Sequence, residues 1–208
     1  MLNELLARYP QLSVCTESLT AAVAAMIACY RNGGKLLLCG NGGSCADCEH
    51  ISGELLKGFL KKRPLPAEQK AAMSAACPLL DESILDQLQG GLPAVALPSL
   101  SSLNTAFAND VDPSLMYAQS VLALGKPNDV LLAISTSGNA ENVAAAAKVA
   151  KGLGLTVIAL TGAGGGRLAQ LADIAVCVPE TETFKVQELH LPVYHYLCAA
   201  IEAAFFAE

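Results

Sequence analysis

Tryptophan is absent from this 208-residue chain, aromatic residues make up 5% and charged residues only 15%. Disorder is excluded, because 53% of the residues are hydrophobic and can build a core. Basic residues are scarce, and the net charge of −6 argues against nucleic acid as the main partner. No run of 18 apolar residues free of charge and proline predicts a membrane span. Because charged residues are so few, we expect other copies of the chain to cover part of its apolar surface.

Cysteine is plentiful, with eight residues, five of which lie in runs rich in Ala, Leu and Val. A chain of this size needs no disulfides, and its first residues lack the layout of a signal peptide. We therefore expect a reduced, cytoplasmic protein. The Cys45-x-x-Cys48 motif is typical of a redox pair or half a zinc site, but the second such motif is missing and the surroundings do not resemble thioredoxin, which favours coincidence.

Apolar runs alternate with helical patterns along the chain. Strands are predicted at 35–39, 93–97, 129–134, 156–160 and 174–178. Helices are predicted within 3–31 with a break at Pro10, and at 45–60, 140–153, 167–172 and 186–206. This alternation predicts an α/β layered domain with a mostly parallel sheet. We expect one domain over 1–208, interrupted at 64–91 by a Pro- and Gly-containing excursion with short helices.

Two polar loops follow predicted strands, where ligands of such sheets bind. Gly40-Asn-Gly-Gly-Ser44 and Ser135-Thr-Ser137 each precede a helix, whose free N–H groups and positive dipole end attract an anion. Simple helix capping and chain turning explain either loop alone equally well. Two such loops in one sheet favour a phosphorylated ligand. Neither is a Walker A motif, and Thr161–Gly166 is only a weak dinucleotide fingerprint.

Acid–base and metal-ligating candidates are few. His50 and Glu54 are four residues apart and share a helix face just after the first loop. The last helix carries Gln187, His190 and His195. Gln187 and His195 lie about 12 Å apart on a straight helix, unless Pro192 distorts it. The spacing leaves open which of the two histidines belongs to a site, and a lone histidine on an apolar helix is more often a core residue.

These motifs, in this order, resemble those of the SIS (sugar isomerase) domain family, in particular the phosphoheptose isomerase family: the Gly40–Ser44 loop, His50-x-x-x-Glu54, Ser135-Thr-Ser-Gly-Asn139, Leu160-Thr-Gly, and Gln187-Glu-x-His190 with His195. The resemblance implies a three-layer α/β/α fold with a five-stranded, parallel, flavodoxin-like sheet. It also implies a homotetramer whose active sites lie at subunit interfaces. The implied reaction is aldose–ketose isomerisation of a phosphorylated sugar, above all sedoheptulose 7-phosphate, through an ene-diol.

The resemblance assigns roles to particular residues. It implies Glu54 as general base and His195 as general acid, and one zinc ion per site held by His50, Glu54, Gln187 and His195. The substrate-binding residues that it implies are Asn41, Gly42, Ser44, Ser135, Thr136, Ser137, Asn142 and Gln187. A carboxylate and an imidazole suit proton transfer between neighbouring carbons, and zinc suits a carbonyl oxygen.

The chain departs from the family pattern at Ala140, where a serine is common, and at Phe184-Lys185, where an acidic residue is common. Lys185 is a candidate phosphate ligand instead. A second hypothesis is a non-catalytic SIS module that binds a phosphosugar or a protein, as in the relative that binds the bacterial replication initiator. That relative lacks the glutamate and the final histidine, so the presence of Glu54 and His195 favours an enzyme.

Overall fold

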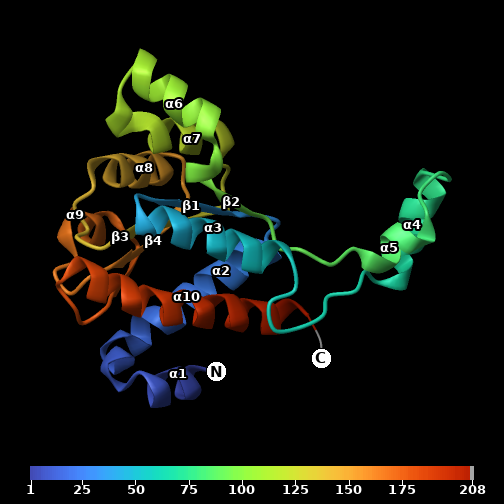
Figure 1. Cartoon of the computed structure of the whole chain (residues 1–208), viewed down its shortest axis with the longest axis horizontal. Helices are drawn as coiled ribbons and strands as arrows, with labels where there is room; N and C mark the ends of the chain where they lie inside the picture. Colours follow the sequence, from blue (N-terminus) through green and yellow to red (C-terminus); the bar gives the residue numbers. More distant parts are fainter. Residues whose placement is uncertain (207–208) are drawn as a thin grey trace.

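A five-stranded parallel sheet forms the centre of the computed structural model, in which residues 1–206 are described (Figure 1). The strand order is β2-β1-β3-β4-β5. The strands are β1 (Leu36–Gly40), β2 (Ala94–Ala96), β3 (Val130–Ser135), β4 (Thr156–Thr161) and β5 (Ile174–Cys177). Each coincides with a predicted apolar run to within two residues at either end, because strands covered on both faces are apolar throughout. The predicted α/β fold with five parallel strands is confirmed.

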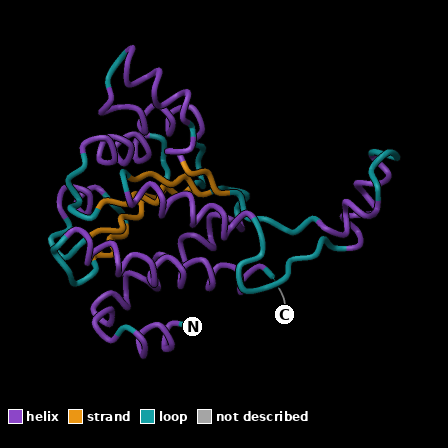
Figure 2. The backbone as a smooth tube through the Cα atoms, in the orientation of Figure 1, coloured by secondary structure: helices purple, strands orange, loops and turns teal. Residues whose placement is uncertain are grey.

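Helices cover both faces of the sheet, and alternate strand residues point into two separate cores (Figure 2). On one face Leu36, Leu38 and Leu132 pack with helices α2 (Thr16–Arg31), α3 (Gly43–Leu56) and α10 (Thr183–Phe205). On the other face Leu37 and Leu131 pack with helices α7 (Met116–Leu124), α8 (Glu141–Gly152) and α9 (Gly166–Leu171). Small alanines on α8 let this helix approach the sheet closely. The remaining elements are α1 (Leu2–Arg8), α4 (Ala67–Ala76), α5 (Glu82–Gln87), α6 (Ser101–Asp110), and the 3-10 helices η1 (Pro10–Cys15), η2 (Leu97–Ser99) and η3 (Pro113–Leu115).

Some predicted helix boundaries are wrong. The helix expected at 45–60 runs from Gly43 to Leu56, because Lys57 turns to an extended conformation and Arg63 takes over the last carbonyl groups. The last helix begins at Thr183, earlier than expected, and continues through Pro192 without a break. Helices α6 and α7 were not predicted. α6 buries only Asn104, so it lacks the apolar stripe by which a helix is recognised.

One apolar helical segment, Pro10–Arg31, is long enough to cross a membrane by length and composition alone. Its apolar side packs in the core: Leu19, Ala22 and Met26 are buried against the sheet and α10. This packing is typical of the core helix of a globular domain. The eight cysteines, all within the described residues, are unpaired, and Cys48 lies buried in the same core as this helix.

Candidate active site

The two predicted phosphate loops lie side by side at the carboxyl edge of the sheet. The first leads from β1 into α3, and its Gly42 has a φ of +55°, a conformation that favours glycine. The second leads from β3 into α8. The side-chain amides of Asn41 and Asn142 exchange two hydrogen bonds of 2.8 and 2.9 Å and tie the loops together. The fold therefore gathers both loops in one place.

The two loops present hydroxyl groups and helix N–H groups, which are the kinds of donor that bind phosphate. Ser44 and Ser135 are buried, Thr136 is half-buried and Ser137 is exposed. Ala140, at the start of α8, makes no side-chain cap, which leaves N–H groups of the first turn for an anion. Lys185, a candidate phosphate ligand, instead pairs with Glu182.

Helices α3 and α10 run in the same direction and pack along a seam that starts at the phosphate loops (Figure 1). At the loop end, Gly43 lies directly against the amide of Gln187. Further along, His50 lies against Tyr194 and His195. Gln187 and His195 therefore contact residues of α3 that are about two turns apart.

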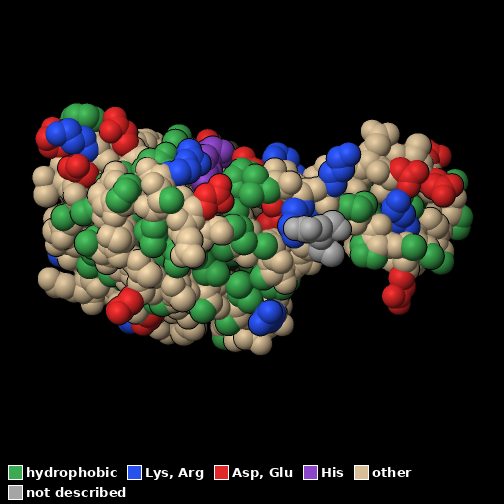
Figure 3. Space-filling model, turned by 90° about the horizontal axis from the view of Figure 1, so that it is seen from below, with side chains coloured by type: hydrophobic (Ala, Val, Ile, Leu, Met, Phe, Trp, Pro, Cys, Tyr) green, Lys and Arg blue, Asp and Glu red, His purple; other side chains and the backbone are tan. Residues whose placement is uncertain are grey.

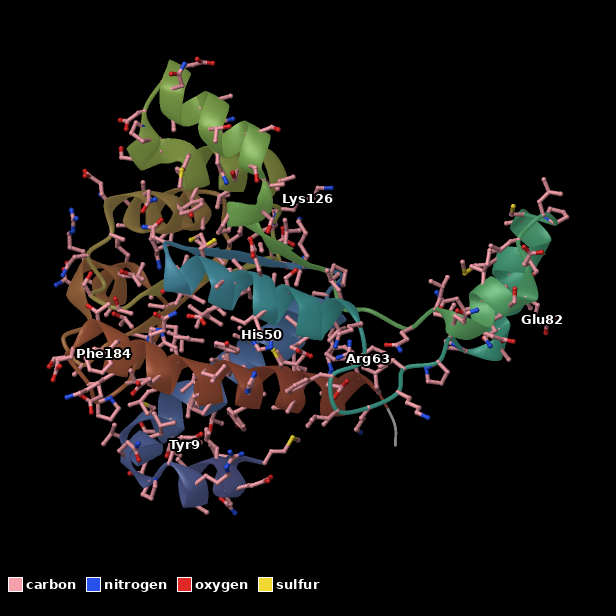
Figure 4. The ribbon with its side chains drawn as sticks, viewed as in Figure 1. Tyr9, His50, Arg63, Glu82, Lys126 and Phe184 are labelled. Carbon is pink, nitrogen blue, oxygen red and sulfur yellow. The ribbon has the colours of Figure 1, made fainter. Side chains whose placement is uncertain are left out.

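The predicted catalytic residues meet at the far part of this seam (Figure 4, where His50 is labelled). His50 Nε2 lies 3.2 Å from Glu54 Oε1, and the rings of His50 and His195 are 5.1 Å apart in edge-to-face contact. Lys57 Nζ lies 3.3 Å from Glu54 Oε2. Burial lowers the pKa of His195, and the neighbouring His50 lowers it further. A carboxylate, two imidazoles and an ammonium group thus share one cluster.

Two residues of the seam were not found from the sequence. Tyr194 places its hydroxyl 3.0 Å from His50 Nδ1 and also contacts the Asp47 carboxylate. Asp47 is buried beside Tyr194 and Gln187; burial raises its pKa, and these polar neighbours and His50 oppose that rise. The recorded hydrogen bond here joins Tyr194 to His50, while the buried Asp47 Oδ2 lacks a hydrogen-bond partner among residues 1–206. The sequence does contain one indication of Asp47, which lies three residues before His50 and on the same helix face.

The structure separates the two histidines of α10. His190 is fully buried beneath β4, where burial lowers its pKa to about 4, and both its ring nitrogens lack partners among the described residues. His195 instead faces His50 and the Phe59 ring. His190 therefore behaves as a core residue, and only His195 belongs to the seam.

The predicted zinc ligands suit the metal in kind, since they are two imidazoles, a carboxylate and an amide. Nε2 of His195 is a buried ring nitrogen without a hydrogen-bond partner among residues 1–206, as a metal-binding nitrogen would be. Within the same residues, however, no group of three or more His, Cys, Asp or Glu side chains is arranged to hold a metal ion. His50 and Glu54 are hydrogen-bonded to each other, and Gln187 lies at the other end of the seam.

A groove of about 450 Å³ opens beside His195. Helix α1 forms one wall, and Leu191 and Tyr196 of α10 form the other. Phe59 and Leu60 close one end of the groove. Its lining combines apolar side chains with Glu4, Arg8 and His195, so the groove reaches one of the proposed catalytic residues.

Substituting Gly43 with Ala tests the close approach of α10 to α3. The new methyl group would displace the flexible end of the Gln187 side chain, so we expect the free energy of unfolding to fall by no more than about 1 kcal/mol. Gly53→Ala is the matched control on the same helix, where the methyl group meets nothing within 4 Å. The control is expected to gain about 0.5–1 kcal/mol. Urea denaturation measures both; equal effects would contradict the described contact.

Comparisons with known proteins show similarity over nearly the whole chain. Two family models described as SIS domain match residues 3–96 and 103–205. The chain is 41% identical over 198 residues to the phosphoheptose isomerase of Methylibium petroleiphilum, covering 94% of this chain and 86% of that one. The corresponding protein of Rhodospirillum rubrum is 37% identical over 93% of the chain and 89% of its own length.

Solved structures give the same result. The phosphoheptose isomerase of Neisseria gonorrhoeae superposes with a TM-score of 0.76 and 33% identity, covering 97% of this chain and 95% of that one. The enzyme of Francisella tularensis has the same TM-score and identity, covering 96% and 92%. On the strength of this full-length similarity, the chain belongs to the SIS domain proteins and, within them, to the phosphoheptose isomerase family.

Proposed function

We propose that this protein is an aldose–ketose isomerase that converts sedoheptulose 7-phosphate into D-glycero-D-manno-heptose 7-phosphate. Membership of the phosphoheptose isomerase family over nearly the whole chain supports the reaction. The single observation that carries the residue assignment is the α3–α10 seam. It joins two anion-binding loops at one end to a carboxylate and an imidazole at the other. A long phosphorylated sugar needs that arrangement, with an anchor for phosphate and a base near its carbonyl end.

In this proposal, the loop residues bind and orient the substrate. Ser44, Ser135, Thr136 and Ser137 hold the phosphate with their hydroxyl and N–H groups, at the helix N-termini. Asn41 and Asn142, which are already fixed by each other, and Gly42 border the phosphate. Gln187 then faces the sugar hydroxyl groups. With only four arginines in the chain, hydroxyls and helix dipoles replace cationic side chains here.

Glu54 and His195 move the protons. The Glu54 carboxylate removes a proton from the carbon next to the ketose carbonyl, this proton exchanges with water while Glu54 carries it, and Glu54 then delivers a proton to the neighbouring carbon. His195 has a lowered pKa, so its neutral ring donates a hydrogen bond or proton to the substrate oxygen, as neutral imidazole does in other ene-diol reactions. The Tyr194 hydroxyl forms a hydrogen bond with His50 Nδ1 and so holds the His50 ring in position.

Zinc, self-association and localisation complete the proposal. His50, Glu54, Gln187 and His195 would hold one zinc ion once the Gln187 side chain reaches along the seam toward His195, and the zinc would supply a Lewis acid for a carbonyl oxygen. We also propose a homotetramer with sites at subunit interfaces, supported by the exposed apolar side chains on the surface. Eight unpaired thiols support a reducing, cytoplasmic environment. We propose a single domain over 1–208 that carries 64–91 as an insertion.

Replacing His195 with Gln tests the assignment of the general acid. We expect kcat for sedoheptulose 7-phosphate to fall by about 10–100-fold, because Glu54 still provides base catalysis. His190→Leu is the control, since a buried ring with two unpartnered nitrogens is replaced by an apolar side chain of similar size. We expect that variant to keep its kcat. The reverse pattern, loss with His190→Leu and retention with His195→Gln, would refute the assignment.

A further inference from the structure

Residues 64–89 form an arm that projects from the body of the molecule (Figures 1 and 2). It consists of α4 and α5, joined by the Lys70–Asp86 ion pair. α4 buries no residue and α5 buries only Leu85, while Leu79 is 92% exposed and Ile84 and Leu88 are each 45% exposed. Helices of 10 and 6 residues are marginal in water by themselves. The arm therefore lacks, in its own chain, the surface that would stabilise it.

The root of the arm is firmly built, so its direction is fixed. Pro64 and Gln89 form an antiparallel bridge, and Gly90 N donates to Arg63 O at 2.7 Å. Arg63, labelled in Figure 4, is fully buried. It pairs with the equally buried Glu202 at 2.8 Å. These contacts join the base of the arm to the body of the molecule.

Charge and apolar surface on the same molecule complement the arm. The arm carries four acidic residues against Lys70, a net charge of −3. Residues 56–62, next to its root, carry three lysines and no acidic residue, a net charge of +3. Leu56 and Leu60 of this basic segment are 51% and 68% exposed. In the space-filling view, acidic side chains lie at several places on the arm, and basic side chains lie near its neck (Figure 3).

We propose that two copies of the chain exchange arms, so that the acidic arm of each lies on the basic segment 56–62 of the other. The arm points away from its own basic segment, which leaves both surfaces uncovered within one chain. If a two-fold axis relates the two copies, each arm covers the basic segment of the other copy, because both copies carry the same arm and the same segment. The proposal rests on the self-association in the proposed function and specifies the surface that forms it.

Arm exchange would place a second copy beside the active site. The basic segment directly follows Glu54, includes Lys57, which contacts Glu54, and includes Phe59, which packs on the His195 ring. The arm of the partner would therefore cover the segment that borders both proposed catalytic residues. This gives the insertion a role in shaping the active site.

A charge-swap series tests the arm exchange in the full-length protein. Asp81→Lys with Glu82→Lys reverses the arm, and Lys61→Glu with Lys62→Glu reverses the segment. Each pair alone is expected to raise the dissociation constant by about tenfold or more in sedimentation velocity, because like charges then face each other. Combining all four changes is expected to restore association. Glu141→Lys with Lys148→Glu on α8 is the control and should have no effect.

A carbodiimide, which joins a carboxylate directly to an amine, locates the contact in a mixture of 15N-labelled and unlabelled wild-type chains. We expect mixed-isotope peptides that link Asp81 or Glu82 to Lys57, Lys61 or Lys62. The arm exchange would be overturned if these peptides were absent and if the charge swaps did not change the association of the protein. The proposed self-association would then still hold, through another surface. A wild type that is monomeric at all concentrations would overturn both, while isomerase activity is assayed separately.

Discussion

Replacing Glu54 with Gln is expected to lower kcat by about 10²–10⁴-fold, the range that a positioned acid–base group contributes. The amide has the shape of the carboxylate and keeps a hydrogen-bonding oxygen, but it cannot accept the proton from carbon. The Glu54 side chain is only 14% exposed and lies between His50 and Lys57, so water cannot easily replace it as a base. The thermal unfolding midpoint should change little.

Glu49→Gln is the matched control for this experiment. Glu49 lies on the same helix, is exposed, and contacts only Ser99 through its carboxylate. The Glu49→Gln variant loses the same charge outside the seam, so its kcat should be unchanged. Equal activity of the Glu54→Gln and wild-type proteins, measured with sedoheptulose 7-phosphate, would rule out Glu54 as the base.

Breaking the buried pair of Arg63 and Glu202 is expected to lower the free energy of unfolding by about 3–5 kcal/mol in either single Ala variant, because the remaining charge is left buried without its partner. Glu202 also accepts hydrogen bonds of 2.8 Å from the backbone N–H groups of Phe59 and Leu60. Arg63 donates to the carbonyl oxygens of Glu54 and Leu55. The pair therefore fixes the end of α3 and the segment after it.

The double variant Arg63→Met/Glu202→Leu distinguishes charge from packing. It leaves neither charge unpaired, so its loss should be smaller than that of either single variant, although the segment still loses its hydrogen bonds. Urea denaturation at neutral pH measures all three. A double variant that loses the sum of the two single effects would contradict a coupled pair.

The same pair predicts a pH dependence. Burial raises the pKa of Glu202, but the backbone N–H donors and Arg63 outweigh it, so the folded pKa lies below the ordinary value. Its stabilising contribution is therefore complete above the pKa of the unfolded chain, about 4.3, and is lost as pH falls through the lower folded pKa. The wild type should lose stability below about pH 4 more steeply than Glu202→Gln.

Much of the fold was predictable because buried parallel strands leave continuous apolar runs. The runs before Gly40 and Ser135 located both strands and both ligand loops. α6 was not predictable, because its stability comes from contacts with η3 and α7 and not from an apolar stripe of its own. Helix α3 ends early because Arg63, seven residues beyond its last residue, caps it, and such a contact leaves no local pattern.

The site was partly predictable. Residue types and loop spacing identified His50 and Glu54, which are neighbours on one helix. The pairing of Asn41 with Asn142 joins residues 101 positions apart and depends on strand order. Tyr194 sits in an apolar helix and looks like a core residue until its hydroxyl is seen against His50. Only the fold separates the roles of His190 and His195.

The central claim is that Glu54 transfers a proton between neighbouring carbons of a phosphorylated ketose. The most direct measurement is NMR of sedoheptulose 7-phosphate incubated in D₂O with the protein or with its Glu54→Gln variant. The account predicts that the wild type forms the aldose heptose 7-phosphate with deuterium at C2, and that the variant does neither. No conversion by the wild type, or conversion without deuterium, would contradict it.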